Sequence, residues 1–130
     1  MNYSKKVLKY FTHPKNLGKI QNPDGFGEVT NPVCGDTTRF YIKMGKKKVG
    51  GKEIEYVKDI KFETLGCAAA VATSSIATEI VKGKPLEQAK KLSKDTIIKK
   101  LGGLPLPKIH CSLLAIGALK KAIKDYEKKK

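Results

Sequence analysis

The sequence predicts an α+β fold in which a three-stranded antiparallel sheet is covered by about five helices. Segments rich in β-forming residues, with alternating apolar and polar side chains, fill much of the stretch before Cys67. Helical spacing of apolar residues dominates after Cys67. At 130 residues, with no internal repeat or linker, the chain is most simply one domain covering residues 1–130.

The first half is expected to hold one helix and all three strands. A short amphipathic helix is predicted over residues 4–11, because the residue before Pro14 is pushed out of helical geometry. A loop rich in Gly, Pro and Asn follows over residues 16–27. The strands are predicted at residues 28–33, 39–44 and 54–65, with a lysine- and glycine-rich turn at residues 45–51.

The second half is expected to be helical. Apolar residues at helical spacing begin at Cys67 and stop at Gly83-Lys84-Pro85. Two shorter helices are predicted over residues 85–92 and 94–101, and residues 102–107 form an extended break. The last helix starts at about His110 and has an apolar face turned inward as far as Tyr126, and residues 128–130 are expected to fray. Two of the cysteines therefore stand at predicted helix starts.

The net charge of +15 suggests an acidic partner. The lysines are dispersed, only one Arg is present and no nucleic-acid motif accompanies them, so we expect an acidic protein partner or a solubilising coat and no specific nucleic acid. No apolar run approaches the ~18 residues of a membrane span, and the N-terminus lacks the apolar core of a signal peptide. We expect a cytoplasmic protein with reduced thiols and no membrane association.

Three cysteines stand in three different contexts, and none forms a CxxC pair. The odd number excludes a framework in which every cysteine is paired in a disulfide. Cys34 precedes a glycine, Cys67 follows one, and Cys111 follows a histidine, each at an expected element boundary. Helix N-termini lower the pKa of a thiol, and thiolates bind metals and attack sulfur. This placement favours a metal or sulfur site over buried structural cysteines.

Two side chains with harder donor atoms than sulfur lie near the thiols in the sequence. Asp36 lies two residues beyond Cys34, so in an extended segment both project to the same side; a turn-stabilising role is the alternative. His110 adjoins Cys111 and could be a ligand, a proton handler or a structural residue. His13, before a proline in a loop, is interpreted as structural.

These motifs resemble the IscU and NifU family of iron–sulfur cluster scaffold proteins over nearly the whole chain. The matching segments are Cys34-Gly35-Asp36, residues 66–75, residues 108–112, and N-terminal patterns at residues 3–7 and 13–18. The resemblance implies a SufE/NifU-like fold. It also implies a carrier rather than an enzyme: a 2Fe-2S cluster is built from iron and persulfide sulfur supplied by a cysteine desulfurase, then passed to acceptor apo-proteins.

The resemblance also suggests residue roles. Cys34, Cys67 and Cys111 would be cluster ligands, with Asp36 or His110 alongside. We expect Cys111 to accept the persulfide, because it starts a helix and has Lys108 and His110 beside it to stabilise a thiolate. Three thiolates and one weaker ligand suit a cluster that is held and then handed on. The same residues would also bind Zn²⁺ in a cluster-free form.

The chain departs from the family pattern in two segments. The stretch between Cys34 and Cys67 is several residues longer, which a longer hairpin can absorb. The chaperone-recognition segment reads Leu-Pro-Leu-Pro-Lys at residues 104–108, which argues against recognition by a dedicated chaperone.

The sequence does not decide between several other functions, nor does it decide the oligomeric state. A zinc-dependent sulfurtransferase is the main alternative, although the spacing from Cys67 to Cys111 lacks the insertion of the SufU branch. A second alternative is a basic, zinc-containing module that binds nucleic acid. A Cys111–His110 hydrolase is disfavoured, because adjacent residues seldom reach nucleophile–base geometry. A homodimer is compatible with the sequence.

Overall fold

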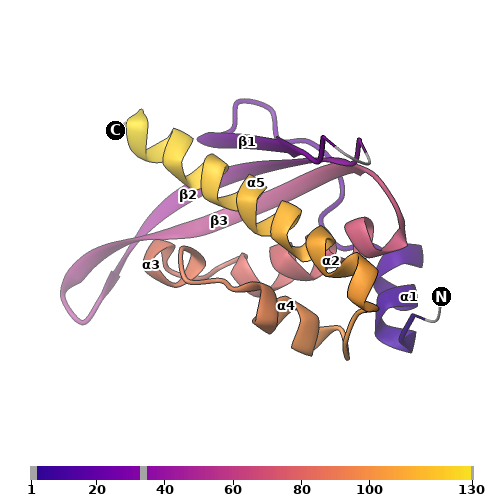
Figure 1. Ribbon diagram of the computed structural model, residues 1–130. Coiled ribbons are helices and arrows are strands. Elements are labelled where there is room, and N and C mark those ends of the chain that lie inside the picture. Colours follow the sequence, from indigo (N-terminus) through magenta and orange to yellow (C-terminus); the bar gives the residue numbers. More distant parts are fainter. Residues whose placement is uncertain (1–2, 33–34, 130) are drawn as a thin grey trace.

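The computed structural model describes residues 3–32 and 35–129 and confirms the predicted α+β class. The strands form one antiparallel sheet in the order β1-β2-β3. Helix α5 lies across β1 and β2, α2 packs on β3 and α5, and α1 packs on α2 (Figure 1). The elements are α1 (Lys5–Thr12), β1 (Gly25–Thr30), β2 (Thr37–Val49), β3 (Lys52–Leu65), α2 (Ala68–Val81), α3 (Leu86–Ala89), α4 (Lys94–Lys100), the 3-10 helix η1 (Leu106–Lys108) and α5 (Ile109–Lys128).

The core lies between the sheet and helices α2 and α5. On β2, Phe40 and Ile42 are fully buried, and on β3, Ile60 and Phe62 are fully buried. The residue between the two members of each pair is partly exposed. This is the period of two expected when one face of a sheet is covered. Helix α2 is buried over nearly its whole length, because it is enclosed by the sheet, α1 and α5. Its first residues are therefore firmly positioned.

Strand β1 approaches α5 so closely that only glycine fits at two positions. A Cβ atom added to Gly27 would lie 2.2 Å from the Ala118 carbonyl oxygen, and one added to Gly25 would lie 2.2 Å from that of Ala122. The Phe26 backbone N–H donates to the Asp125 carboxylate over 2.9 Å. These contacts fix the position of α5 on the sheet.

All three strands begin earlier than predicted, β2 and β3 by two residues each. Strand β1 begins at Gly25, three residues before the predicted start at residue 28, because its glycines serve close packing rather than a turn. The predicted strand end at residue 33 lies outside the described residues. The predicted turn at residues 45–51 is mostly strand: only Gly50 and Gly51 turn the chain, with φ of 59° and 81°, as a two-residue hairpin loop requires. Strands β2 and β3 thus form a long hairpin that projects from one end of the sheet (Figure 1).

The helices of the second half follow the predictions with one shortening and one addition, the 3-10 helix η1 (Leu106–Lys108), which begins inside the predicted extended break. The helix predicted over residues 85–92 is a four-residue helix, α3 (Leu86–Ala89), after which the chain turns. Helix α4 has the predicted position, and the last helix begins at Ile109, close to the predicted start. None of the helices within residues 3–32 and 35–129 is long and apolar enough to cross a membrane.

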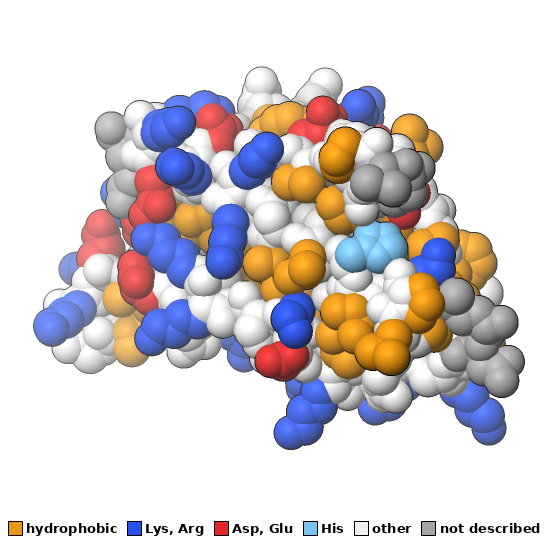
Figure 2. Space-filling model, in the orientation of Figure 1, with side chains coloured by type: hydrophobic (Ala, Val, Ile, Leu, Met, Phe, Trp, Pro, Cys, Tyr) orange, Lys and Arg blue, Asp and Glu red, His pale blue; other side chains and the backbone are white. Residues whose placement is uncertain are grey.

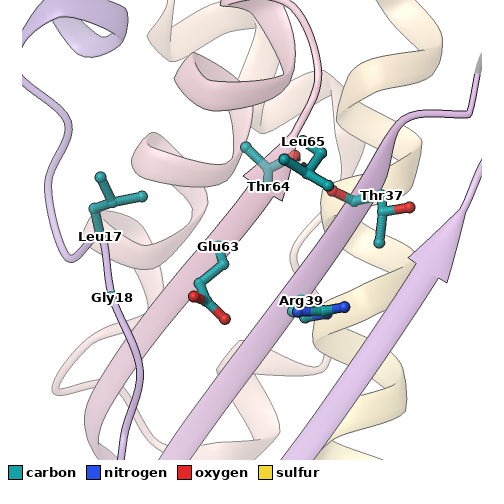
Figure 3. A pocket seen from close by; sticks show the side chains of 7 residues that line it. All are labelled: Leu17, Gly18, Thr37, Arg39, Glu63, Thr64 and Leu65. Atoms are coloured by element: carbon teal, nitrogen blue, oxygen red, sulfur yellow. Dashed lines mark hydrogen bonds between the residues drawn. The ribbon is translucent and has the colours of Figure 1, made fainter.

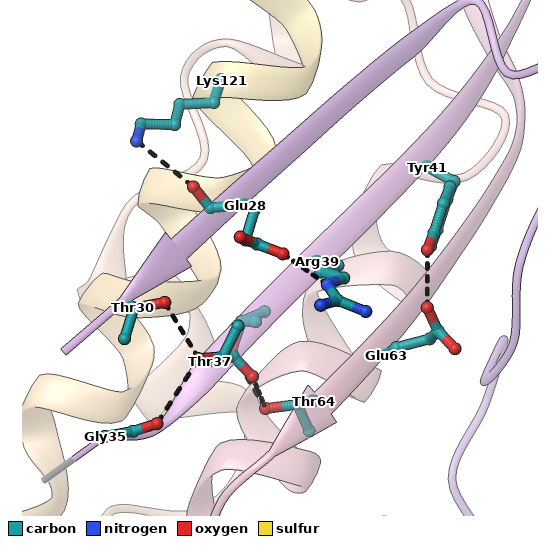
Figure 4. Close-up of polar contacts among 10 residues, drawn as sticks. Glu28, Thr30, Gly35, Thr37, Arg39, Tyr41, Glu63, Thr64 and Lys121 are labelled. Carbon is teal, nitrogen blue, oxygen red and sulfur yellow. Dashed lines mark hydrogen bonds and ion pairs between the residues drawn. The ribbon is translucent and has the colours of Figure 1, made fainter.

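The other face of the sheet carries polar contacts rather than helices (Figure 4). Arg39 pairs with Glu28 across β1 and β2, and the Tyr41 hydroxyl donates to Glu63 over 2.6 Å. The Thr64 hydroxyl donates to the Thr37 carbonyl over 2.8 Å and ties the start of β2 to the end of β3. The segment that enters β2 is thereby held beside the segment that leaves β3.

Candidate metal and sulfur site

Three segments distant in sequence meet at one end of the sheet. Asp36 lies just before β2, Cys67 is the N-cap residue of α2, and Cys111 is the third residue of α5. Sheet pairing places Thr37 opposite Leu65, so Asp36 and Cys67 are brought together by the register of β2 and β3. The packing of α2 against α5 adds Cys111.

The potential ligand atoms are close enough to share one ion. The sulfur atoms of Cys67 and Cys111 are 3.8 Å apart, and the Cys111 sulfur lies 3.7 Å from His110 Nε2. One oxygen of Asp36, one ring nitrogen of His110 and the Cys111 sulfur all lie within 4.8 Å of one another. His110 and Cys111 both reach the site although they are adjacent. Cys34 lies outside the described residues, so its role stays a prediction.

Packing around the site holds Cys111 in place and leaves little space between Gly66 and Asp36. Cys111 is 1% exposed and packs against Ala69 and Ala70 of α2. The Thr73 hydroxyl lies 3.3 Å from the Cys111 carbonyl oxygen and can donate to it. A Cβ on Gly66 would lie 3.0 Å from an Asp36 carboxylate oxygen, so a larger residue would crowd the carboxylate. The glycine before Cys67 therefore has a steric role that the sequence pattern alone does not explain.

The two thiols differ in acidity. Burial raises the pKa of Cys67, but the Ala70 and Ala69 backbone N–H groups, the Cys111 thiol and the Lys108 ammonium outweigh burial, so the pKa is lowered. Burial first, and then the charge of Cys67, raises the pKa of Cys111 to about 12. Of the two thiols, Cys67 is therefore the one that loses its proton more readily. The expected lowering is confirmed for Cys67 and is wrong for Cys111, because Cys111 is buried inside the first turn of its helix.

Lys108 and Tyr3 both interact electrostatically with the Cys67 thiol. The charge of Cys67 is the largest cause of the raised pKa of Lys108. Burial and then the charge of Cys67 raise the pKa of Tyr3, which also shares a hydrogen bond with that thiol. The sequence prediction paired Lys108 with Cys111, whereas the lysine mainly serves Cys67. It missed Tyr3, because nothing in the spacing of a residue near the N-terminus indicates proximity to a cysteine on another helix.

Exposed apolar side chains surround the site, and Figure 2 shows hydrophobic side chains (orange) grouped around a histidine (pale blue) on this face of the molecule. Leu65, Leu106 and Leu113 are 75%, 83% and 51% exposed, and each lies within five residues of Cys67 or Cys111 in sequence. A cavity of about 360 Å³ lies beside the last residues of β3 on the outer face of the sheet (Figure 3). Its lining residues are Leu17, Gly18, Thr37, Arg39, Glu63, Thr64 and Leu65. A rim of this kind suits contact with protein partners.

The donor set is chemically mixed. The Cys111 thiol, the Asp36 carboxylate and the His110 imidazole lie within reach of one ion, and the Cys67 thiol lies beside Cys111. Thiolate and imidazole suit both zinc and iron, and carboxylate is a harder, more exchangeable ligand. Residues 2–130 match the family model described as the NifU-like N terminal domain. The chain belongs to this family.

Named proteins are similar in sequence to almost the whole of this chain. The chain is 51% identical over 127 residues to iron-sulfur cluster assembly scaffold protein IscU 1 of Archaeoglobus fulgidus, a match that covers 98% of this chain and 78% of that protein. It is 44% identical over 133 residues to the protein named IscU of Azotobacter vinelandii, covering 100% of this chain and 98% of that one.

Solved structures share the fold. A crystal structure described as a putative iron-sulfur cluster assembly scaffold protein for the SUF system of Fervidobacterium islandicum aligns with a TM-score of 0.68 and 26% identity, covering 93% of this chain and 96% of that chain. A NifU-like N-terminal protein of Brucella abortus aligns with a TM-score of 0.67 and 23% identity, covering 98% and 95%. The SufE/NifU-like fold implied by the sequence motifs is thus confirmed.

Proposed function

We propose that this protein is a scaffold on which a 2Fe-2S cluster is assembled and from which the cluster is transferred to acceptor apo-proteins. The observation that carries the proposal is the convergence of Asp36, Cys67, His110 and Cys111 at one end of the fold. Its membership of the NifU-like N-terminal family and its relatives named as scaffold proteins support it. The protein acts as a carrier, with iron and sulfide as its cargo.

The proposed ligands are the three cysteines with one weaker ligand. Cys67 and Cys111 approach each other closely enough to ligate a shared cluster, and Cys34 is added from its motif with Asp36. Asp36 or His110 completes the set. A carboxylate or imidazole at one corner exchanges more readily than a thiolate, which suits a cluster destined for transfer.

Sulfur is proposed to arrive as a persulfide from a cysteine desulfurase, with Cys111 as the acceptor. The incoming sulfane sulfur bonds to the acceptor thiolate, while its bond to the desulfurase cysteine breaks and that cysteine leaves as a thiolate. Cys67 competes for this role, because it is more exposed and its pKa is lowered. A cation at Asp36 and His110 would favour Cys111 instead, since a coordinating thiol loses its proton.

The acceptor is decided by mass spectrometric mapping of sulfur delivered to the wild type, Cys67→Ser and Cys111→Ser. First labelling of Cys111 in the wild type is expected. First labelling of Cys67 or Cys34 in the wild type would transfer the role to that residue.

We propose that the protein works in the cytoplasm. Cys67 and Cys111 are free thiols 3.8 Å apart, and an oxidising compartment would favour a disulfide between them. A reducing compartment keeps both thiols available, which supports the proposal.

The competing function is zinc-dependent sulfur transfer, because the same residues fit Zn²⁺ as Cys₃Asp or Cys₃His. Anaerobic incubation with ferrous iron, cysteine and the desulfurase separates the two functions. A scaffold develops sulfide-to-iron absorbance and retains acid-labile sulfide, and Cys67→Ser loses both. Asp95→Asn, a change at an exposed carboxylate on α4, is the control and should retain them. Protein that binds only zinc and retains no sulfide would contradict the scaffold function.

A further inference from the structure

A second hollow lies away from the cysteines, between α1, α2 and α4. It has a volume of about 470 Å³, within the range of small-molecule sites. Lysines from three separate segments line it: Lys6 and Lys9 from α1, Lys84 from the turn after α2, and Lys100 from the end of α4. The other lining residues are Tyr10, Ile76, Glu79 and Ile80. We call this hollow the α1–α2 groove.

The charge of the groove is unbalanced. Four lysines and one glutamate line it, a net charge of +3. Among the ion pairs of residues 3–32 and 35–129, none involves Lys6, Lys9, Lys84 or Lys100. The single carboxylate, Glu79, lies near the Tyr10 hydroxyl, and burial, followed by this carboxylate, raises the pKa of Tyr10. Like charges gathered around one hollow repel each other unless an anion joins them.

The segments that carry the lysines are anchored by their backbones. The Ser4 hydroxyl donates to the Leu101 carbonyl over 2.6 Å, which joins the start of α1 to the end of α4 and keeps Lys6 near Lys100. The Val57 N–H donates to the Lys84 carbonyl over 2.9 Å, which fixes the turn after α2 against β3. The groove is therefore built from fixed segments and not from a mobile tail. Binding there would order only the lysine side chains.

The floor of the groove is apolar. Ile76 is 4% exposed, Ile80 is half-buried, and the Tyr10 ring lies at the same edge. Lysine ammonium groups around an apolar floor match a ligand that joins several phosphate charges to a flat, weakly polar ring. We propose that the α1–α2 groove binds a nucleoside triphosphate, with the phosphates on the lysines and the base on Ile76, Ile80 and Tyr10.

The test is isothermal titration of the full chain with ATP, without divalent cations and at low salt. Lys6→Gln/Lys84→Gln removes two charges from the groove and should weaken ATP binding at least tenfold. Lys48→Gln/Lys52→Gln removes two charges from the β2–β3 hairpin, far from the groove in the sequence, and should change ATP binding less than twofold. An equal loss in both double variants would show attraction to the overall charge of +15 and overturn the site.

Two further ligands test the class of compound. Tripolyphosphate should bind more weakly than ATP by at least threefold, because it lacks a group for the apolar floor. Equal affinity would overturn the nucleotide assignment, and tighter binding of a hexaglutamate peptide would do so as well. No binding of ATP at 1 mM would overturn the proposal altogether. Because these variants leave the cysteine site untouched, cluster assembly should proceed normally in them and provides the check that each variant is folded.

Discussion

Replacing Gly27 with alanine tests whether close packing of β1 on α5 holds the fold together. The added Cβ would lie 2.2 Å from the Ala118 carbonyl oxygen and 2.5 Å from the Ala122 nitrogen, both backbone atoms of α5. An ordinary contact begins at 3.4 Å, so strand and helix must separate by 3.4 − 2.2 = 1.2 Å at this point. Gly27 does not have a positive φ, so an alanine there meets no backbone strain and the clash alone acts.

The expected loss of stability is the balance of two costs and one gain. Overpacking of this kind costs ~1–3 kcal/mol. Alanine in place of glycine returns ~0.5–1 kcal/mol through the unfolded chain. A separation of about 1 Å also forfeits a quarter to a half of the dispersion contacts between the two surfaces. We expect Gly27→Ala to lower the free energy of unfolding by about 2 kcal/mol in a urea titration of the metal-free protein.

The control is Gly117→Ala, which adds a methyl group to the same interface from the helix side. Its Cβ would lie 3.3 Å from Val29 Cγ2, the end of a side chain rather than backbone. Helix propensity favours alanine by ~1 kcal/mol, so this variant should be as stable as the wild type or more stable. A loss below about 0.5 kcal/mol for Gly27→Ala would refute the packing argument.

Three other predictions concern the site and the surface. Asp36→Ala should slow transfer of a bound cluster to an apo-ferredoxin, followed by circular dichroism, because a labile oxygen ligand is removed; a variant unable to retain any cluster would make Asp36 an essential ligand. Association with the desulfurase should slow as salt rises past about 0.15 M, where the screening length is ~8 Å, and a salt-independent rate would reduce the lysines to a solubilising coat. The Phe26 N–H is the largest cause of a lowered pKa for Asp125, and Lys129 adds to it. The contribution of Asp125 to stability is therefore present above its unfolded pKa of ~3.9 and is lost as the pH falls below that value. Unfolding titrations should therefore show Asp125→Asn to be less stable than the wild type at pH 6, by up to about 1 kcal/mol, and equal to it at pH 2.

The sequence by itself determined the fold class and the family, and it indicated side chains that the structure brings together at one end of the sheet. Alternation of apolar residues along β2 and β3, and helical spacing after Cys67, are local patterns that follow from the geometry of strands and helices. The ligand motifs were readable because each places its chemistry within a few adjacent residues. Asp36, His110 and Cys111 do come together as those motifs imply.

Only the tertiary structure decided what depends on contacts between distant segments. The start of β1 was misplaced because Gly25 and Gly27 look like turn residues until α5 is packed against them. The acidity of Cys111 was misjudged, since burial and the charge of Cys67, rather than a helix start, set its pKa. The proximity of Tyr3 to Cys67 depends on packing across the fold. A pKa and a close approach both depend on what surrounds an atom in space, which local sequence does not specify.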